Sequence, residues 1–235
     1  MHKENGFTLV ELIVALFVGV LVLVAIYSTV NIAQRTSSGL ERRVIAQQDA
    51  RSALELMAAE IRMASYNPLS RDNIWYDATT ASVSCFTTLG NANYRGIQEA
   101  AANAITVEMD IDGNGVIGNH ENEKIRYVYD SDNKYITRST NCGGGQAFLG
   151  DSNAQQERKT VLVENNAAGI PVFRYYDGSG VELAAPVTAE IPNIKRVEVT
   201  LVTDTSNADI GSNTRRRMIY STSVIPRNHF ALIYR

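Results

Sequence analysis

Residues 6–26 of the chain read GFTLVELIVALFVGVLVLVAI, an apolar run interrupted only by Thr8, Glu11 and Gly19. At about 1.5 Å of rise per residue, this run is long enough to cross a bilayer as a helix. The six residues before Phe7 are too few and too polar to form the charged and apolar regions of a secretory signal peptide. A carboxylate within a membrane-spanning helix is costly and usually has a functional partner, so Glu11 is a candidate functional residue.

The residues around the first glycine are similar to a known signature. Gly6 precedes Phe7 at the start of the apolar run, and Glu11 is the fifth residue counted from Phe7. This arrangement resembles the type IV prepilin signature. The resemblance implies cleavage after Gly6 by prepilin peptidase and N-methylation of Phe7. An ordinary signal anchor with one tolerated glutamate is the alternative, and it leaves the Gly-Phe junction unexplained.

The resemblance also implies an assembly role for Glu11. After cleavage, Phe7 carries an amino group that stays positively charged when it is methylated. Glu11 of a neighbouring subunit would neutralise this charge. Because unpaired charges are costly in hydrocarbon, such an ion pair would set the register between subunits. The alternative is a glutamate that simply protonates inside the membrane.

A helical pattern continues beyond the apolar run. Asn67 and Pro68 end this pattern, and it therefore predicts one helix over residues 7–64, with Gly19 and Gly39 as weak points. Its first half is apolar nearly all round, and its second half needs only one buried stripe. The residues of that stripe recur at steps of three and four: Ala46, Ala50, Ala53, Met57, Ile61 and Ala64.

Beyond Pro68 the pattern changes to short β-like segments separated by turn residues. We expect strands at residues 83–88, 104–109, 124–129, 134–139, 160–163, 172–176, 181–184, 197–202 and 218–224. Tight turns are expected at residues 130–133 and 177–180, and flexible loops at residues 143–145 and 206–213. Along residues 197–202 the odd positions are expected to face the core and the even positions to face outward.

The sequence therefore predicts an α+β protein. A long N-terminal helix, transmembrane in its first half, packs on an antiparallel β-sheet domain, which is the type IV pilin-like fold that the resemblance implies. We expect four parts: a leader at residues 1–6, a transmembrane and assembly helix at residues 7–30, an amphipathic helix at residues 31–66, and a β-rich globular domain at residues 67–235.

A second candidate site reads DIDGNGVIGNHE over residues 110–121. Counted from Asp110, it has the spacing of an EF-hand calcium loop, including the glycine at position 6 that permits a sharp turn. The flanking residues are strand-like, so this would be a calcium loop in a β context, where Asn119, Glu123 or a carbonyl group could replace Glu121. A loop rich in Asp, Asn and Gly that binds nothing is the alternative. The expected Ca²⁺ ligands are Asp110, Asp112, Asn114, the Val116 carbonyl and Glu121.

Composition excludes some classes of function. The 22 Lys and Arg against 25 Asp and Glu give a net charge of −3, so no nucleic-acid partner is expected. The sequence has no His/Cys metal spacing, nucleophile elbow or phosphate loop, and we expect no enzyme.

Both cysteines, Cys85 and Cys142, follow the membrane segment, where an oxidising compartment would favour a disulfide between them. Two separate buried thiols are the alternative.

Other segments resemble a subgroup of the same family. Residues 51–68 and 224–228 are similar to the helix end and the C-terminal segment of PilW-like minor pilins, and residues 173–180 are more loosely similar to J-type minor pseudopilins. The resemblance implies a minor pilin that initiates or caps type IV pilus assembly.

Its partners would be prepilin peptidase, other minor and major pilins and the inner membrane. It would reside in that membrane with its C-terminal domain in the periplasm, and later in the filament at the cell surface. The rivals are a minor pseudopilin of type II secretion and a calcium-dependent, adhesin-like binding module at a filament tip.

Overall fold

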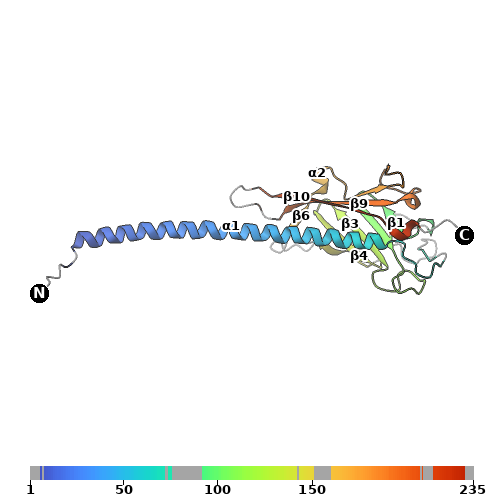
Figure 1. Ribbon diagram of the computed structural model, residues 1–235, viewed down its shortest axis with the longest axis horizontal. Helices are drawn as coiled ribbons and strands as arrows, with labels where there is room; N and C mark the ends of the chain where they lie inside the picture. The colour runs from blue at the N-terminus through green and yellow to red at the C-terminus, as the bar shows by residue number, and fades with distance from the viewer. Residues whose placement is uncertain are drawn as a thin grey trace.

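A long helix and a β-rich domain make up the molecule, as Figure 1 shows. The computed structural model describes residues 6, 8–71, 74–75, 92–141, 143–150, 160–206, 208 and 214–230. Helix α1 (Leu9–Met63) is continuous over 55 residues, which corresponds to about 80 Å. Gly19 and Gly39 lie inside it without interrupting it. The predicted single N-terminal helix is therefore confirmed.

The two halves of α1 have different surroundings. No residue from 9 to 45 is buried, and this half of the helix extends away from the domain (Figure 1). The second half carries the predicted stripe, whose six residues are each at most 6% exposed. Leu54 and Ala58 widen that stripe, and both are buried. The domain therefore begins to cover the helix at Ala46, and the predicted buried face is confirmed.

The domain contains two antiparallel sheets. The first has the order β1-β2-β3-β4-β5, with strands Ile97–Ala100, Ala104–Glu108, Lys124–Asp130, Tyr135–Thr140 and Gln146–Leu149. The second has the order β10-β9-β7-β8, and β6 also pairs with β9. Its strands are β6 (Val161–Val163), β7 (Phe173–Tyr176), β8 (Glu182–Leu183), β9 (Arg196–Thr205) and β10 (Arg217–Val224). Three short 3-10 helices are η1 (Ala92–Tyr94), η3 (Ile191–Asn193) and η4 (Arg227–Phe230).

Most of the predicted strands are present, with some differences. The strands at β1 and β5 were not predicted, and the strand expected at residues 83–88 lies outside the described residues. The outward position expected for Val202 is wrong, because Val202 is fully buried. The short helix α2 (Asn165–Ala168) contacts β9, and the Asn165 side chain accepts a hydrogen bond from the Val202 amide at 2.9 Å. A second layer therefore covers this part of β9.

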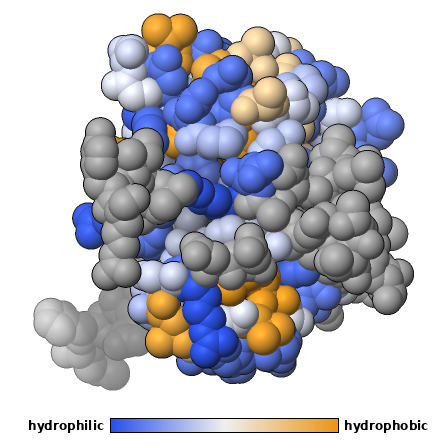
Figure 2. Space-filling model, turned by 90° about the vertical axis from the view of Figure 1, so that its right-hand side faces the viewer, coloured by the Kyte–Doolittle hydropathy of each residue, from blue (hydrophilic) through white to orange (hydrophobic). Residues whose placement is uncertain are grey.

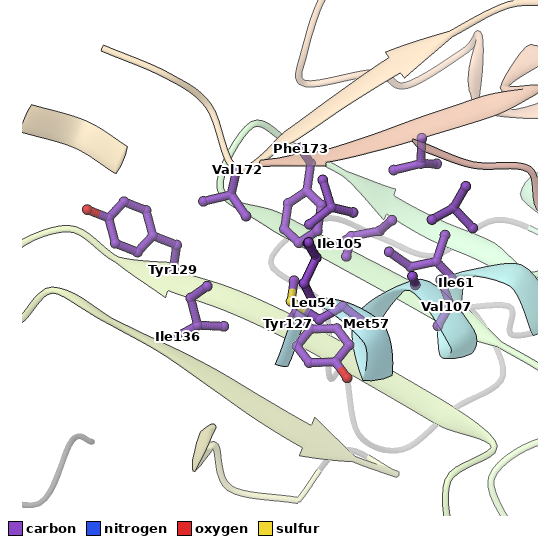
Figure 3. Packing of buried hydrophobic residues seen from close by; sticks show 14 of the residues in the cluster. Leu54, Met57, Ile61, Ile105, Val107, Tyr127, Tyr129, Ile136, Val172 and Phe173 are labelled. Carbon is purple, nitrogen blue, oxygen red and sulfur yellow. The ribbon is translucent and has the colours of Figure 1, made fainter. Parts of the chain in front are cut away.

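The core lies between the second half of α1 and both sheets. Leu54, Met57 and Ile61 of α1 belong to one buried cluster with Val107 of β2, Tyr127 of β3 and Phe173 of β7 (Figure 3). Polar contacts fix the same interface, because Glu60 of α1 accepts hydrogen bonds from the Tyr127 hydroxyl at 2.5 Å and from the Arg138 guanidinium at 2.6 Å. Burial, reinforced by the Glu60 carboxylate, raises the pKa of the Tyr127 phenol well above its usual range.

The C-terminal end of α1 is anchored by a buried hydrogen-bond chain. Ser65 follows the helix with a left-handed φ of 65°, and its amide donates to the Glu108 carbonyl at 2.8 Å. The Ser65 hydroxyl accepts from the Gly96 amide at 3.1 Å and lies 2.9 Å from Nδ1 of His229. Nε2 of His229 lies 2.9 Å from the Ile191 carbonyl. The helix end is therefore joined to the first sheet, to η3 and to the C-terminal segment.

Candidate functional site

The first candidate site is the N-terminal junction. Gly6 is exposed, and a Cβ added at this position would have no heavy atom within 4 Å. Phe7 lies outside the described residues. The fold of this chain therefore does not require glycine at position 6, and a requirement for it has to come from a partner that acts on the junction.

Glu11 forms a capping box with Thr8 at the start of α1. The Glu11 carboxylate accepts hydrogen bonds from the Thr8 amide and hydroxyl, both at 2.9 Å. The Thr8 hydroxyl in turn accepts from the Glu11 amide at 3.3 Å. Each side chain thus satisfies a backbone donor that the helix start would otherwise leave free. This role for Thr8 was not predicted, although the Thr-x-x-Glu spacing carries the signal.

The exposed half of α1 is strongly apolar. Within the described residues, α1 is the one helix long and apolar enough to cross a membrane, and none of that apolar stretch is buried in the protein. By contrast, the described surface at the opposite end of the molecule is mostly hydrophilic, with smaller apolar groups (Figure 2). An apolar rod of this length requires lipid or other subunits to cover it.

The second candidate site is the connection between β2 and β3. Glu108 pairs with Lys124 at the end of the β2–β3 ladder, and the Met109 amide donates to the Glu123 carbonyl at 2.9 Å. The next residue, Asp110, donates its amide to the carbonyl of Tyr66, just beyond α1, at 2.8 Å. The hairpin register therefore places Asp110 and Glu123 together at the base of the loop, next to the helix end.

Three carboxylates meet at this loop: Asp110, Asp112 and Glu123. One carboxylate oxygen from each lies within 4.8 Å of those from the other two. Asp110 and Glu123 are both 0% exposed, whereas Asp112 is exposed. The nearby Lys124 ammonium lies 3.9 Å from Glu108, and burial lowers the pKa of this lysine against the attraction of Glu108 and Glu123. In the described part of the chain, none of the three carboxylates forms an ion pair with a basic side chain.

The structure brings only part of the predicted ligand set together. Asn114 is exposed and its amide group donates to Asp112 at 2.6 Å. Val116 is also exposed, on the same turn. Glu121 is exposed and does not belong to the carboxylate cluster, where Glu123 lies instead. Sequence spacing had offered Glu123 only as a substitute, because the strand register that selects it was not known.

Both cysteines of the predicted disulfide, Cys85 and Cys142, lie outside the described residues. The pairing stays a prediction.

Comparison with known proteins gives one match. A family model described as the prokaryotic N-terminal methylation motif matches residues 1–27. This segment includes the Gly6-Phe7 junction, Glu11 and the first part of α1. No curated protein and no solved structure matches the chain.

The motif and the fold agree with each other. The methylation motif marks the N-terminus of type IV prepilin-like subunits, and it is followed here by a long apolar helix that packs on an antiparallel β domain. The chain thus carries a prepilin-type N-terminal methylation motif at residues 1–27, followed by an α+β architecture that is consistent with a type IV pilin-like fold.

Proposed function

We propose that this protein is a minor pilin, a structural subunit that initiates or caps a type IV pilus after leader cleavage and N-methylation. The observation that carries the proposal is the methylation motif at residues 1–27, placed on a helix whose residues 9–45 bury nothing against their own domain. Such a helix suits storage in the inner membrane, with the β domain in the periplasm. It equally suits later burial among the helices of other pilins.

The resemblance of residues 51–68 and 224–228 to PilW-like minor pilins supports the minor role. These two segments meet in the fold, because Ser65 contacts His229, directly after the second segment. They lie together at the C-terminal end of α1, which is a structural feature rather than a catalytic one.

The processing step is tested at Gly6. Gly6→Leu should leave the leader attached, because the peptidase requires a small residue there, whereas the fold leaves the position free. Gly19→Leu is the matched control, since an added side chain there also meets no heavy atom within 4 Å. Mass spectrometry of the N-terminus should find N-methyl-Phe7 in the wild type and in the control, and Met1 in Gly6→Leu. An intact Met1 in wild-type filaments would overturn the proposal.

The assembly step is tested at Glu11, where two roles have to be separated. Glu11→Gln keeps a side chain that can complete the capping box but removes the charge. Thr8→Ala keeps the charge and removes the cap. If Glu11 neutralises the Phe7 amine of a neighbour, Glu11→Gln should lose incorporation in competition with the wild type, and Thr8→Ala should retain it. The reverse pattern would show that capping alone matters.

Neighbouring subunits would show whether this protein belongs to a pilus or to a type II secretion system. Crosslinking in the membrane followed by mass spectrometry should recover pilus subunits as neighbours of this protein. Recovery of secretion-system pseudopilins alone would reject the pilus and leave the pilin-like assembly mechanism in place.

A further inference from the structure

We propose that the β2–β3 connection is a calcium site formed by Asp110, Asp112 and Glu123, and that the bound ion fastens the end of helix α1 to the first sheet. This inference goes beyond the assembly function, since it concerns the domain rather than the N-terminal helix.

The first argument is the state of the two buried carboxylates. Asp110 uses Oδ2 to accept a hydrogen bond from the Gly115 amide at 2.9 Å, and Glu123 uses Oε2 to accept from the amides of Gly118 and His120 at 2.8 and 3.1 Å. Their other oxygens, Oδ1 of Asp110 and Oε1 of Glu123, are buried and have no hydrogen-bond partner. Buried polar atoms in proteins are almost always satisfied, so two oxygens without a protein partner in one cluster favour a ligand site.

The second argument is charge. Two fully buried carboxylates and a third exposed one lie within 4.8 Å of each other. Lys124 attracts Glu123, and the Arg71 side chain lies against Gly115 of the same loop, but neither forms an ion pair with the three carboxylates. Like charges repel strongly in a low-dielectric interior, and burying them unpaired is costly. A divalent cation would remove both penalties at once.

The donor chemistry selects the ion. All three groups are carboxylates, the ligands that hard cations prefer, and the loop between them is rich in glycine and adaptable. Mg²⁺ demands a nearly ideal octahedron, whereas Ca²⁺ accepts the irregular geometry that a hairpin loop provides. Asn114, the Val116 carbonyl and water are available on the same turn to complete the coordination.

The strand register explains why Glu123 replaces Glu121. The β2–β3 ladder runs to Glu108 and Lys124 and continues through the Met109–Glu123 backbone bond, so Glu123 lies across from Met109 and beside Asp110. Glu121 falls two residues earlier, in a turn where Asn122 has a φ of 65°. The ligand loop is therefore two residues longer than the EF-hand spacing.

The position of the site gives the ion its role. The Asp110 amide binds the Tyr66 carbonyl directly after α1, and Ser65 binds the Glu108 carbonyl. An ion that holds Asp110 against Glu123 therefore stabilises the connection through which the assembly helix is attached to the domain.

The proposal is tested on the full chain in detergent micelles, by thermal unfolding in calcium, in magnesium and in EDTA. Wild-type protein should gain about 5–10 °C when free calcium exceeds its Kd a hundredfold. Glu123→Gln should abolish this shift, and its melting temperature in EDTA should equal or exceed that of the wild type, because repulsion is relieved. The matched control, Glu121→Gln, should respond to calcium like the wild type.

Binding is measured independently by calorimetric titration of calcium into the wild type, Asp110→Asn, Glu123→Gln and Glu121→Gln. A single site in the wild type and the control, weakened at least tenfold in Asp110→Asn, supports the proposal. Superimposed melts in calcium and EDTA, an equal response to magnesium, or loss of binding in Glu121→Gln but not in Glu123→Gln would each overturn it. If calcium binds but Gly6→Leu and the wild type are processed alike, the pilin assignment fails while the calcium site stands.

Discussion

At the scale of single residues, His229 shows how a buried side chain can limit stability. It is 2% exposed, and burial lowers its pKa to about 4. The nearby cations Lys195 and Arg95 also lower this pKa, whereas the hydrogen bond to the Ile191 carbonyl opposes the shift. Its Nε2 donates to the Ile191 carbonyl, so Nδ1 is left to accept from the Ser65 hydroxyl. The folded protein therefore requires neutral His229.

This requirement predicts a pH dependence. The folded-state pKa is depressed below the unfolded value of about 6.5, so the contribution of His229 is complete above pH 6.5 and is lost as the pH falls toward 4. The loss should be on the order of 3 kcal/mol. Urea unfolding at several pH values should show a flatter profile between pH 6.5 and 4 for His229→Gln. Because carboxylates titrate equally in both proteins, parallel profiles would contradict this account.

A second residue-scale prediction concerns the cysteines. Cys85 and Cys142 should form a disulfide that stabilises the domain by roughly 4 kcal/mol in the chain-entropy description. Thiol labelling of denatured, unreduced protein should modify no cysteine, and reduction should expose both. Two labelled thiols before reduction would reject the bond.

At the scale of secondary-structure elements, Glu60 joins α1 to β3 and β4. Its carboxylate is 13% exposed, and it binds the Arg138 guanidinium through both oxygens, at 2.6 and 3.2 Å, in addition to the Tyr127 hydroxyl. Apolar residues from Leu54 to Ile61 pack α1 against the sheets. The Glu60–Arg138 ion pair fixes the rotation of the helix about its axis and its position along the sheet.

Removing both partners of this pair should cost less stability than the sum of the two single removals. Glu60→Ala leaves the Arg138 charge largely buried and unpaired and should cost about 3 kcal/mol. The double variant Glu60→Ala with Arg138→Ala should be less unstable than the sum of the single changes. Tyr127→Phe is the control, because it removes one hydrogen bond and should cost about 1 kcal/mol. Denaturant unfolding of all four variants measures the coupling, and strictly additive losses would contradict it.

Elements with a repeating pattern could be predicted from the sequence, and those fixed by distant contacts could not. Buried residues recur every three or four positions along α1 and at every second position along β3, so each pattern identifies its element. Strand β1 reads Ile97-Gln98-Glu99-Ala100 and is buried on both faces. Its two polar residues break the apolar pattern that would identify a buried strand in the sequence. Glu99 is neutralised there by Arg126, at 2.7 Å and 27 residues away. The same reason explains Glu123, whose place in the acidic cluster depends on pairing across a hairpin.

At the scale of the whole molecule, the chain divides into an exposed apolar rod and a closed domain, and the division falls within a single helix. Residues 9–45 contribute no buried side chain, and the core begins at Ala46. The stability of the domain should therefore be independent of the segment that anchors and assembles the subunit. Such independence would let the helix exchange lipid for neighbouring subunits without disturbing the fold.

Two deletions test this independence. A chain lacking residues 1–30 keeps every buried residue of α1, so it should be soluble and monomeric and should melt within about 2 °C of the full chain in detergent. A chain lacking residues 1–55 also loses Ala46, Ala50, Ala53 and Leu54 from the core, and should lose on the order of 5 kcal/mol, enough to unfold a marginally stable domain. Circular dichroism melts compare the three proteins. If the shorter deletion already lowers the melting temperature substantially, the apolar half of α1 supports the domain as well as anchoring it, and a change in its surroundings during assembly would be felt in the core.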